Sequence, residues 1–196
     1  MPNEPNRCPW ANTAPLLQRY HDTEWGVPCH DERHLFKMLI LEGKQAGLSW
    51  YGILKKKDML CAAFDDFDPQ KLVAYDEKKI EPLLRDPGII RNRLKVSAVI
   101  ANARAYFDLC ERHGSLDSYL WGFAGGRQVV GNWNTQKQVP ITTPLSDEIS
   151  RDLKRLGFKF VGSTIIYSYL QAVGVVNDHL VTCAFRRTDA YRDGGA

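Results

Sequence analysis

The sequence contains no long apolar run. No stretch approaches the roughly 18 consecutive apolar residues that a membrane-spanning helix needs. The first ten residues, MPNEPNRCPW, also lack the basic and apolar regions of a secretory signal peptide. Internal repeats are missing, and no segment alternates apolar and polar residues around a tight turn. These absences argue against a solenoid and a β-rich fold, and they favour a cytoplasmic protein with no membrane partner.

The net charge is also small, and the cysteines do not show the spacing of a disulfide framework. The formal net charge is only +3 over 196 residues, so a polyanion would have to be bound by a local basic patch. The five cysteines are odd in number and widely spaced, which is unlike a disulfide framework. Hydrophobic residues make up 44% of the chain and charged residues 25%, as in ordinary globular proteins. We therefore expect a single domain over residues 1–196.

Helical signals dominate what is present. Capping residues before apolar positions at helical spacing predict helix starts at Asp31, Ser49, Asp68, Asp76 and Ser146. The longest predicted helix covers about residues 90–110. Residues 122–144 are rich in Gly, Gln, Asn and Thr and predict a surface loop or a crossing between lobes. The expected fold class is all-α, arranged in two helical lobes.

Residues 77–110 have the pattern of a helix–hairpin–helix. Asp86-Pro87-Gly88 interrupts one helix and a second begins at once, so Gly88 permits a tight turn. The first amides of the second helix, with Arg91 and Lys95 nearby, suit a DNA phosphate. Taken alone, the segment is equally compatible with a simple αα-turn that has a solvated basic face.

Four residues near the two ends of the chain form a candidate metal site. His179 and Cys183 are four apart, so a helix would place them on one face, and Cys8 and His21 lie near the other terminus. Two thiolates and two imidazoles complete a tetrahedral structural zinc site with no open position. From spacing alone, hydrogen-bonded histidines and buried cysteines explain these residues at least as well.

The N-terminal half carries aromatic side chains around the segment LEGKQAGLSW, residues 41–50. Trp10, Tyr20, Trp25 and Trp50 could sandwich a planar base, and the carboxylate of Glu42 could accept hydrogen bonds from its amine. For each aromatic residue alone, a place in the hydrophobic core is the simpler interpretation. Together with the hairpin, they indicate a base-flipping site.

Several blocks resemble the DNA-3-methyladenine glycosylase I family from about residue 8 to residue 183. They are CPW, YHDTEWGVP, LEGKQAGLSW, DPGIIRNRLK, FKFVGSTIIYSYLQAVGVVNDH and the final Cys183. The resemblance implies an all-α helix–hairpin–helix glycosylase fold whose terminal regions, about 8–21 and 179–183, are clasped by structural Zn²⁺.

By position, the resemblance assigns functional roles to particular residues of this sequence. The implied zinc ligands are Cys8, His21, His179 and Cys183. The implied base-pocket residues are Trp10, Tyr20, Trp25, Glu42 and Trp50, with Glu42 as the catalytic residue. Gly47 and Leu48 resemble the plug that enters the DNA stack, and Lys44 stands where the family often carries Gln.

The implied reaction is hydrolysis of the N-glycosidic bond of 3-methyladenine in alkylated duplex DNA. It would leave an abasic site and release 3-methyladenine, and we expect the enzyme to act as a monomer. No lysine is placed for a Schiff base, so no lyase activity is expected. Asp108 lies about twenty residues beyond the hairpin, where related glycosylases carry a catalytic aspartate, but we expect it to be solvated. The alternatives are a glycosylase for another damaged base and a zinc-stabilised DNA-binding module without activity.

Overall fold

The computed structural model describes residues 4–187, and most of them are helical. The helices are α1 (Pro15–Thr23), α2 (Glu32–Gln45), α3 (Trp50–Ala63), α4 (Pro69–Leu72), α5 (Glu77–Arg85), α6 (Arg93–His113), α7 (Leu116–Phe123), α8 (Pro144–Arg155) and α9 (Ser163–Ala172). Short 3-10 helices lie at Pro9–Thr13, Asp65–Phe67 and Gln136–Gln138. Within residues 4–187, no helix is long and apolar enough to cross a membrane.

Most helix starts follow the predicted caps. The side chains of four predicted caps accept hydrogen bonds from first-turn amides: Asp31, Ser49, Asp68 and Asp76. The predicted cap at Ser146 is wrong, because α8 begins one turn earlier, at Pro144. Thr143 caps this helix, and the Ser146 hydroxyl completes a reciprocal capping box with it.

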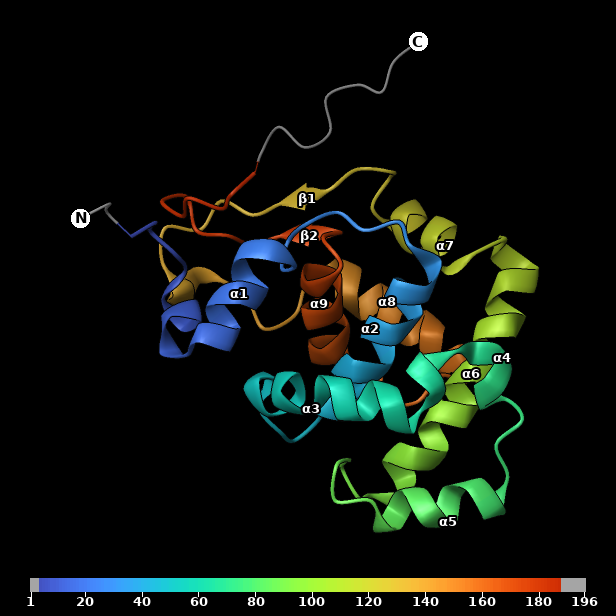
Figure 1. Ribbon diagram of the computed structural model, residues 1–196. Helices are drawn as coiled ribbons and strands as arrows, with labels where there is room; N and C mark the ends of the chain where they lie inside the picture. Colours follow the sequence, from blue (N-terminus) through green and yellow to red (C-terminus); the bar gives the residue numbers. More distant parts are fainter. Residues whose placement is uncertain (1–3, 188–196) are drawn as a thin grey trace.

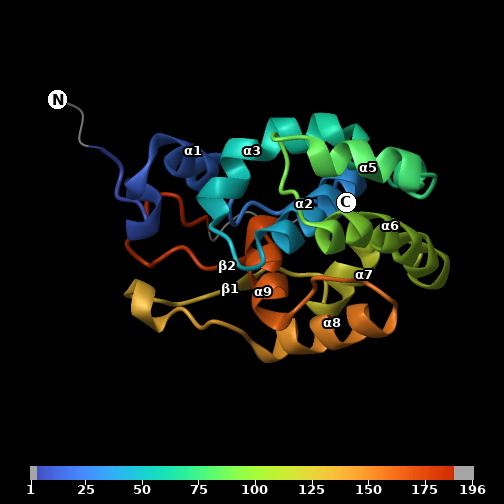
Figure 2. The same ribbon diagram turned by 90° about the horizontal axis from the view of Figure 1, so that it is seen from below.

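Helix α2 is the centre of the structure. In Figure 1 it runs beside α9, and it packs against α3, α6, α7 and α9. Of the seven positions from Leu35 to Leu41, all except Lys37 are almost fully buried. The buried apolar residues form one continuous cluster that extends from Cys8 to Cys183, so the two expected lobes share a single core. Figure 2 shows α3 and α5 on one side of α2 and α8 on the other.

The expectation of a purely helical fold is wrong at one place. Two short strands, β1 (Val129–Val130) and β2 (Val176–Asn177), pair in parallel with Val129 opposite Val176 (Figure 1). The stretch 122–144 is therefore not a free loop. Its backbone amides find partners in the segment after α9, as at Val129 N to Val175 O, 2.9 Å.

The hairpin between α5 and α6 has the predicted tight turn. A Cβ added at Gly88 would lie 2.9 Å from Asp86 Oδ1, which already accepts the Gly88 amide proton, so a larger residue would push the Asp86 side chain out of this position. Lys56 Nζ donates to the carbonyls of Pro87 and Gly88 and ties the turn to α3. Helix α6 begins at Arg93, three residues later than predicted, because Asn92 caps it.

The two terminal segments lie side by side. Ala184 N donates to Asn6 O at 2.8 Å, and the Asn6 side chain donates to Thr182 O at 2.7 Å. These hydrogen bonds hold the two terminal segments together beside the regions, about 8–21 and 179–183, that zinc is expected to clasp. They bring residues more than 150 positions apart into contact.

Candidate active site and metal centre

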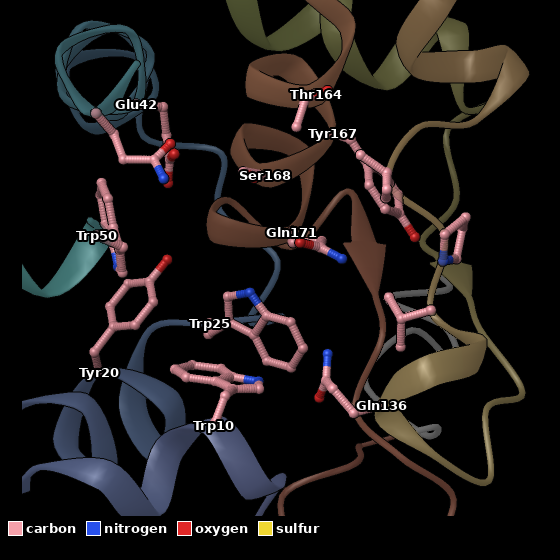
Figure 3. A pocket seen from close by; sticks show the side chains of 14 residues that line it. Trp10, Tyr20, Trp25, Glu42, Trp50, Gln136, Thr164, Tyr167, Ser168 and Gln171 are labelled. Carbon is pink, nitrogen blue, oxygen red and sulfur yellow. The ribbon is translucent and has the colours of Figure 1, made fainter. Parts of the chain in front are cut away.

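One cavity of about 290 Å³ collects the predicted aromatic residues and the predicted carboxylate. Trp10, Tyr20, Trp25, Glu42 and Trp50 all line it (Figure 3). They come from the 3-10 helix at Pro9–Thr13, from α1 and the turn after it, from the last turn of α2, and from the first residue of α3. The other lining residues are Gln45, Gln136, Val139, Pro140, Ile141, Thr164, Tyr167, Ser168 and Gln171.

The aromatic rings form two tilted pairs. Tyr20 and Trp50 have centroids 5.4 Å apart at 55°, and Trp10 and Trp25 have centroids 5.1 Å apart at 78°. Edge-to-face packing of this kind fixes ring orientation. Figure 3 shows the first pair near Glu42 and the second pair farther from it. The walls can therefore hold a flat aromatic ligand close to the carboxyl group.

Glu42 is the acidic residue of the cavity and is only 3% exposed. Burial raises the pKa of its carboxyl group to about 8, and desolvation is the cause. With this pKa, Glu42 is mostly protonated at pH 7. The carboxyl group in turn helps to raise the pKa of Tyr20 well above its usual value, after the larger effect of burial.

The loop between α2 and α3 carries an exposed leucine beside the cavity. Leu48 is 48% exposed, and its amide donates to Gln45 O at 2.7 Å. Gly47 has a φ of +74°, a conformation that favours glycine. The sharp turn directs an apolar side chain outward next to a residue, Gln45, that lines the pocket.

Cys8, His21, His179 and Cys183 form a buried cluster whose ligand atoms lie within 4.8 Å of one another. Cys183 Sγ is 3.3 Å from His179 Nδ1 and 3.5 Å from His21 Nε2, and Cys8 Sγ is 3.8 Å from His179 Nδ1. Hydrogen bonds from Cys8 and from both imidazoles lower the pKa of the Cys183 thiol, which favours a thiolate. The four residues can hold a metal ion.

The remaining ring nitrogens of both histidines have partners. His21 Nδ1 lies 2.8 Å from Asp22 Oδ1, and His179 Nε2 lies 3.0 Å from Trp25 O. Such outer contacts orient metal-binding imidazoles and fix which nitrogen faces the metal. The Trp25 ring also lies 4.6 Å from the His179 ring, so the cluster supports the back wall of the cavity.

Comparisons with known proteins assign the chain to a family. A model of the methyladenine glycosylases matches residues 10–187. DNA-3-methyladenine glycosylase 1 of Escherichia coli (strain K12) is 47% identical over 177 residues, which are 90% of this chain and 95% of that protein. The chain belongs to the methyladenine glycosylase family. The resemblance found in the sequence is thereby confirmed.

Other members of the family agree in sequence and in structure. DNA-3-methyladenine glycosylase of Haemophilus influenzae (strain ATCC 51907 / DSM 11121 / KW20 / Rd) is 37% identical over 90% of this chain and 96% of that protein. The structure of 3-methyladenine DNA glycosylase I from Staphylococcus aureus, solved to explain recognition of 3-methyladenine, matches with a TM-score of 0.90. The two are 34% identical, over 93% of this chain and 97% of that one.

Two lysines of this family member are buried. Lys95 was expected on a solvated face in contact with DNA phosphate, but it is buried and donates to Lys44 O at 2.8 Å and Ala46 O at 2.6 Å. Its ammonium group satisfies carbonyls at the end of α2 and stabilises the loop that carries Leu48. Arg91 is exposed and stays available for phosphate.

Lys44, which stands where the family often carries Gln, is buried at the end of α2. Its side chain is 2% exposed, and Nζ has no hydrogen-bond partner among the described residues. The ammonium group lies 4.1 Å from the centre of the Phe64 ring. Burial, with a smaller effect of nearby Lys95, lowers the pKa of Lys44 to about 7.

Some lining residues were not predicted individually, although α9 lies within a block of the resemblance. Tyr167, Ser168 and Gln171 face the cavity from α9, and Gln136 faces it from the stretch 122–144. Their sequence pattern is that of an ordinary amphipathic helix and a polar loop, so no local signal distinguishes them. Asp108 is exposed and does not line the cavity, as expected.

Proposed function

We propose that this protein excises 3-methyladenine from alkylated duplex DNA by flipping the base into the cavity and hydrolysing its N-glycosidic bond. The observation that carries the proposal is the placement of Glu42 within an aromatic cavity, beside a loop with an exposed leucine. A flipped base needs aromatic walls, a polar group that reads its edge, and a side chain to replace it in the stack. The relatives named for 3-methyladenine support the choice of base.

Methylation at N3 gives the base in DNA a positive charge, so it is already activated as a leaving group. When the bond between the sugar and N9 breaks, its electron pair moves to the base, which becomes neutral. Water then adds to the sugar carbon and loses a proton to solvent, leaving an abasic site. The enzyme therefore needs to bind and orient the cation more than it needs to supply acid.

Glu42 is the group that meets this charge. A cation beside it favours the carboxylate at low effective dielectric. Because the pKa of Glu42 is about 8 in the empty cavity, ionisation at pH 7 costs about 1.4 kcal/mol, one pKa unit. After cleavage the neutral base no longer attracts the carboxylate, which favours release of the product. We assign binding and transition-state stabilisation to Glu42 on this basis.

Binding to duplex DNA is assigned to two further elements. Leu48, with Gly47 allowing its turn, would fill the gap left by the flipped base. The hairpin would contact phosphates through the exposed Arg91, because the Gly88 amide is already bonded to Asp86 Oδ1 within the turn. The cavity lining contains no lysine within residues 4–187, which supports hydrolysis without a lyase step.

We further propose that the metal held by Cys8, His21, His179 and Cys183 is structural Zn²⁺. Zinc binds sulfur at about 2.3 Å and nitrogen at about 2.0–2.1 Å. At a tetrahedral angle these lengths place ligand atoms roughly 3.3–3.8 Å apart, and the three S···N distances are 3.3, 3.5 and 3.8 Å. Four protein ligands leave no position for substrate, so zinc would stabilise the clasp. The cytoplasmic location and the monomeric state stay predictions.

The test is to incubate the protein with duplex DNA that contains 3-methyladenine and to measure the released base by chromatography. An abasic site should appear in equal amount, and an unmethylated duplex serves as the control. Glu42→Gln should release much less base while it still binds DNA. If the protein binds the damaged duplex but releases no base, the proposal of a glycosylase is refuted in favour of a binding module.

A further inference from the structure

Gln171 lies in the last turn of α9 and lines the cavity. Figure 3 shows its side chain between Tyr167 and Trp25, with the amide nitrogen turned toward Tyr167. An amide can rotate by 180° and exchange its donor and its acceptor, so its orientation decides what it offers a ligand. What fixes the orientation of Gln171 therefore matters for recognition.

Asp178 fixes it. This carboxylate is 2% exposed and accepts hydrogen bonds from three side chains. Trp133 Nε1 donates to Oδ1 at 2.7 Å, while Gln171 Nε2, at 2.6 Å, and the Tyr167 hydroxyl donate to Oδ2. An ionised carboxylate accepts only, so the amide nitrogen of Gln171 must face Asp178. The amide oxygen is consequently directed away from Asp178.

The backbone closes tightly around this carboxylate. A Cβ added at Gly131 would overlap both Trp133 Nε1 and Asp178 Oδ1, so the chain approaches here as closely as glycine allows. Gly131 N also donates to Asn177 O at 2.9 Å, next to the β1–β2 pair. Asp178 has little freedom to move, and the side chains it orients are held with it.

We propose that Gln171 is a specificity-determining residue that presents a fixed carbonyl acceptor to the flipped base, and that Asp178 is the positioning residue that keeps the amide from turning. This inference rests on the proposed function and names a second group that reads the base. The negative end of the amide dipole attracts a cationic purine or an amine edge, and it disfavours a base that turns an acceptor to this wall. Unlike Glu42, an amide keeps this property at every pH.

A purely structural role for Asp178 is the alternative, and rescue can separate the two. In Asp178→Asn, the Trp133 indole can only donate, so it keeps the new amide oxygen. The new amide nitrogen then faces Gln171 and forces its oxygen to turn around, which presents a donor to the base. The Tyr167 hydroxyl can rotate to accept. Removing the indole nitrogen by Trp133→Phe frees the Asn amide to turn back and restore the original orientation.

The experiment measures kcat/KM for release of 3-methyladenine from a methylated duplex, with Tm and metal content recorded for each protein. Wild type is measured first, because absence of release there refutes the proposed function and not this inference. Gln171→Met and Asp178→Asn should each lower kcat/KM by about tenfold, the effect of one hydrogen bond to a charged group. Trp133→Phe, the control, should lower Tm but change kcat/KM by less than about threefold, since Gln171 keeps its partner.

The double variant Trp133→Phe with Asp178→Asn should recover most of the kcat/KM lost in Asp178→Asn, although its Tm should be lower than that of either single variant. A structural role predicts the opposite, because removing two members of one network should be worse than removing one. The inference is overturned if the double variant is no more active than Asp178→Asn. It is also overturned if Gln171→Met retains wild-type kcat/KM. This second result does not depend on whether the Asp178 variants fold.

Discussion

Replacing Glu42 by Gln should remove the pH dependence of base excision. Glu42 is buried with a pKa of about 8, so only a small fraction of its carboxyl groups is ionised at neutral pH. From that pKa the ionised fraction is about 1% at pH 6, about 9% at pH 7 and about 90% at pH 9. If the cationic base is captured by the carboxylate, kcat/KM follows this fraction.

The wild-type kcat/KM should therefore rise roughly 90-fold between pH 6 and pH 9. Glu42→Gln has the shape of the protonated residue and does not titrate, so its profile should be flat. The two proteins should be similar at pH 6 and differ most at pH 9. The assay is release of 3-methyladenine from a methylated duplex, corrected at each pH for spontaneous loss of base.

Arg91→Ala is the matched control, because a lost phosphate contact should weaken excision by the same factor at every pH. A flat wild-type profile would refute the reasoning, and so would an equally steep profile for Glu42→Gln.

A second readout is stability. The folded protein keeps the Glu42 proton up to pH about 8, whereas the unfolded chain releases it near pH 4.5. Across that window the unfolding free energy falls with rising pH, by up to roughly 5 kcal/mol, and Glu42→Gln should abolish this fall.

Three further changes test other parts of the structure. Lys44→Met should raise the unfolding free energy at pH 7 by on the order of 2 kcal/mol, because it removes a buried ammonium that has no hydrogen-bond partner among the described residues. Since the pKa of Lys44 is about 7 when folded and near 10.5 when unfolded, the stability of the wild type, but not of the variant, should rise with pH across that interval in urea unfolding. Lys95→Met should lower excision from duplex DNA but leave the salt dependence of DNA binding unchanged, whereas Arg91→Ala should reduce its slope by roughly one unit. In the Lys95→Met background, Leu48→Ala should cost much less excision than in wild type, and additive effects would contradict a tie between Lys95 and the loop. Cys183→Ser should abolish stoichiometric zinc in metal analysis and lower Tm, and an unchanged metal content would contradict the assigned site.

The sequence determined the local features of this protein because their causes are local. A capping side chain needs only the amides of the next turn, which is why Asp31, Ser49, Asp68 and Asp76 were identified correctly. The exposure of Leu48 followed from Gly47 and the short loop around it. Ser146 was misassigned because Thr143, three residues earlier, also carries a hydroxyl that can cap, and in the structure Thr143 caps α8.

Sequence motifs identified the individual site residues, but only the tertiary structure brings them together. Spacing alone left Cys8, His21, His179 and Cys183 equally compatible with unrelated roles, since their two halves are separated by more than 150 residues. The clasp between the terminal segments places their ligand atoms within 4.8 Å of one another. No local sequence pattern predicts this distance between the ligand atoms.

The tertiary structure alone decided the protonation and partners of the buried polar groups. Lysines at positions 44 and 95 look like surface charges in the sequence, yet one faces Phe64 and the other holds carbonyls at the end of α2. The orientation of Gln171 depends on Asp178, which reaches it from the segment after α9. Desolvation and hydrogen bonding depend on which atoms surround a group in space, so they are set by packing between distant segments and cannot be read from neighbouring residues in the chain.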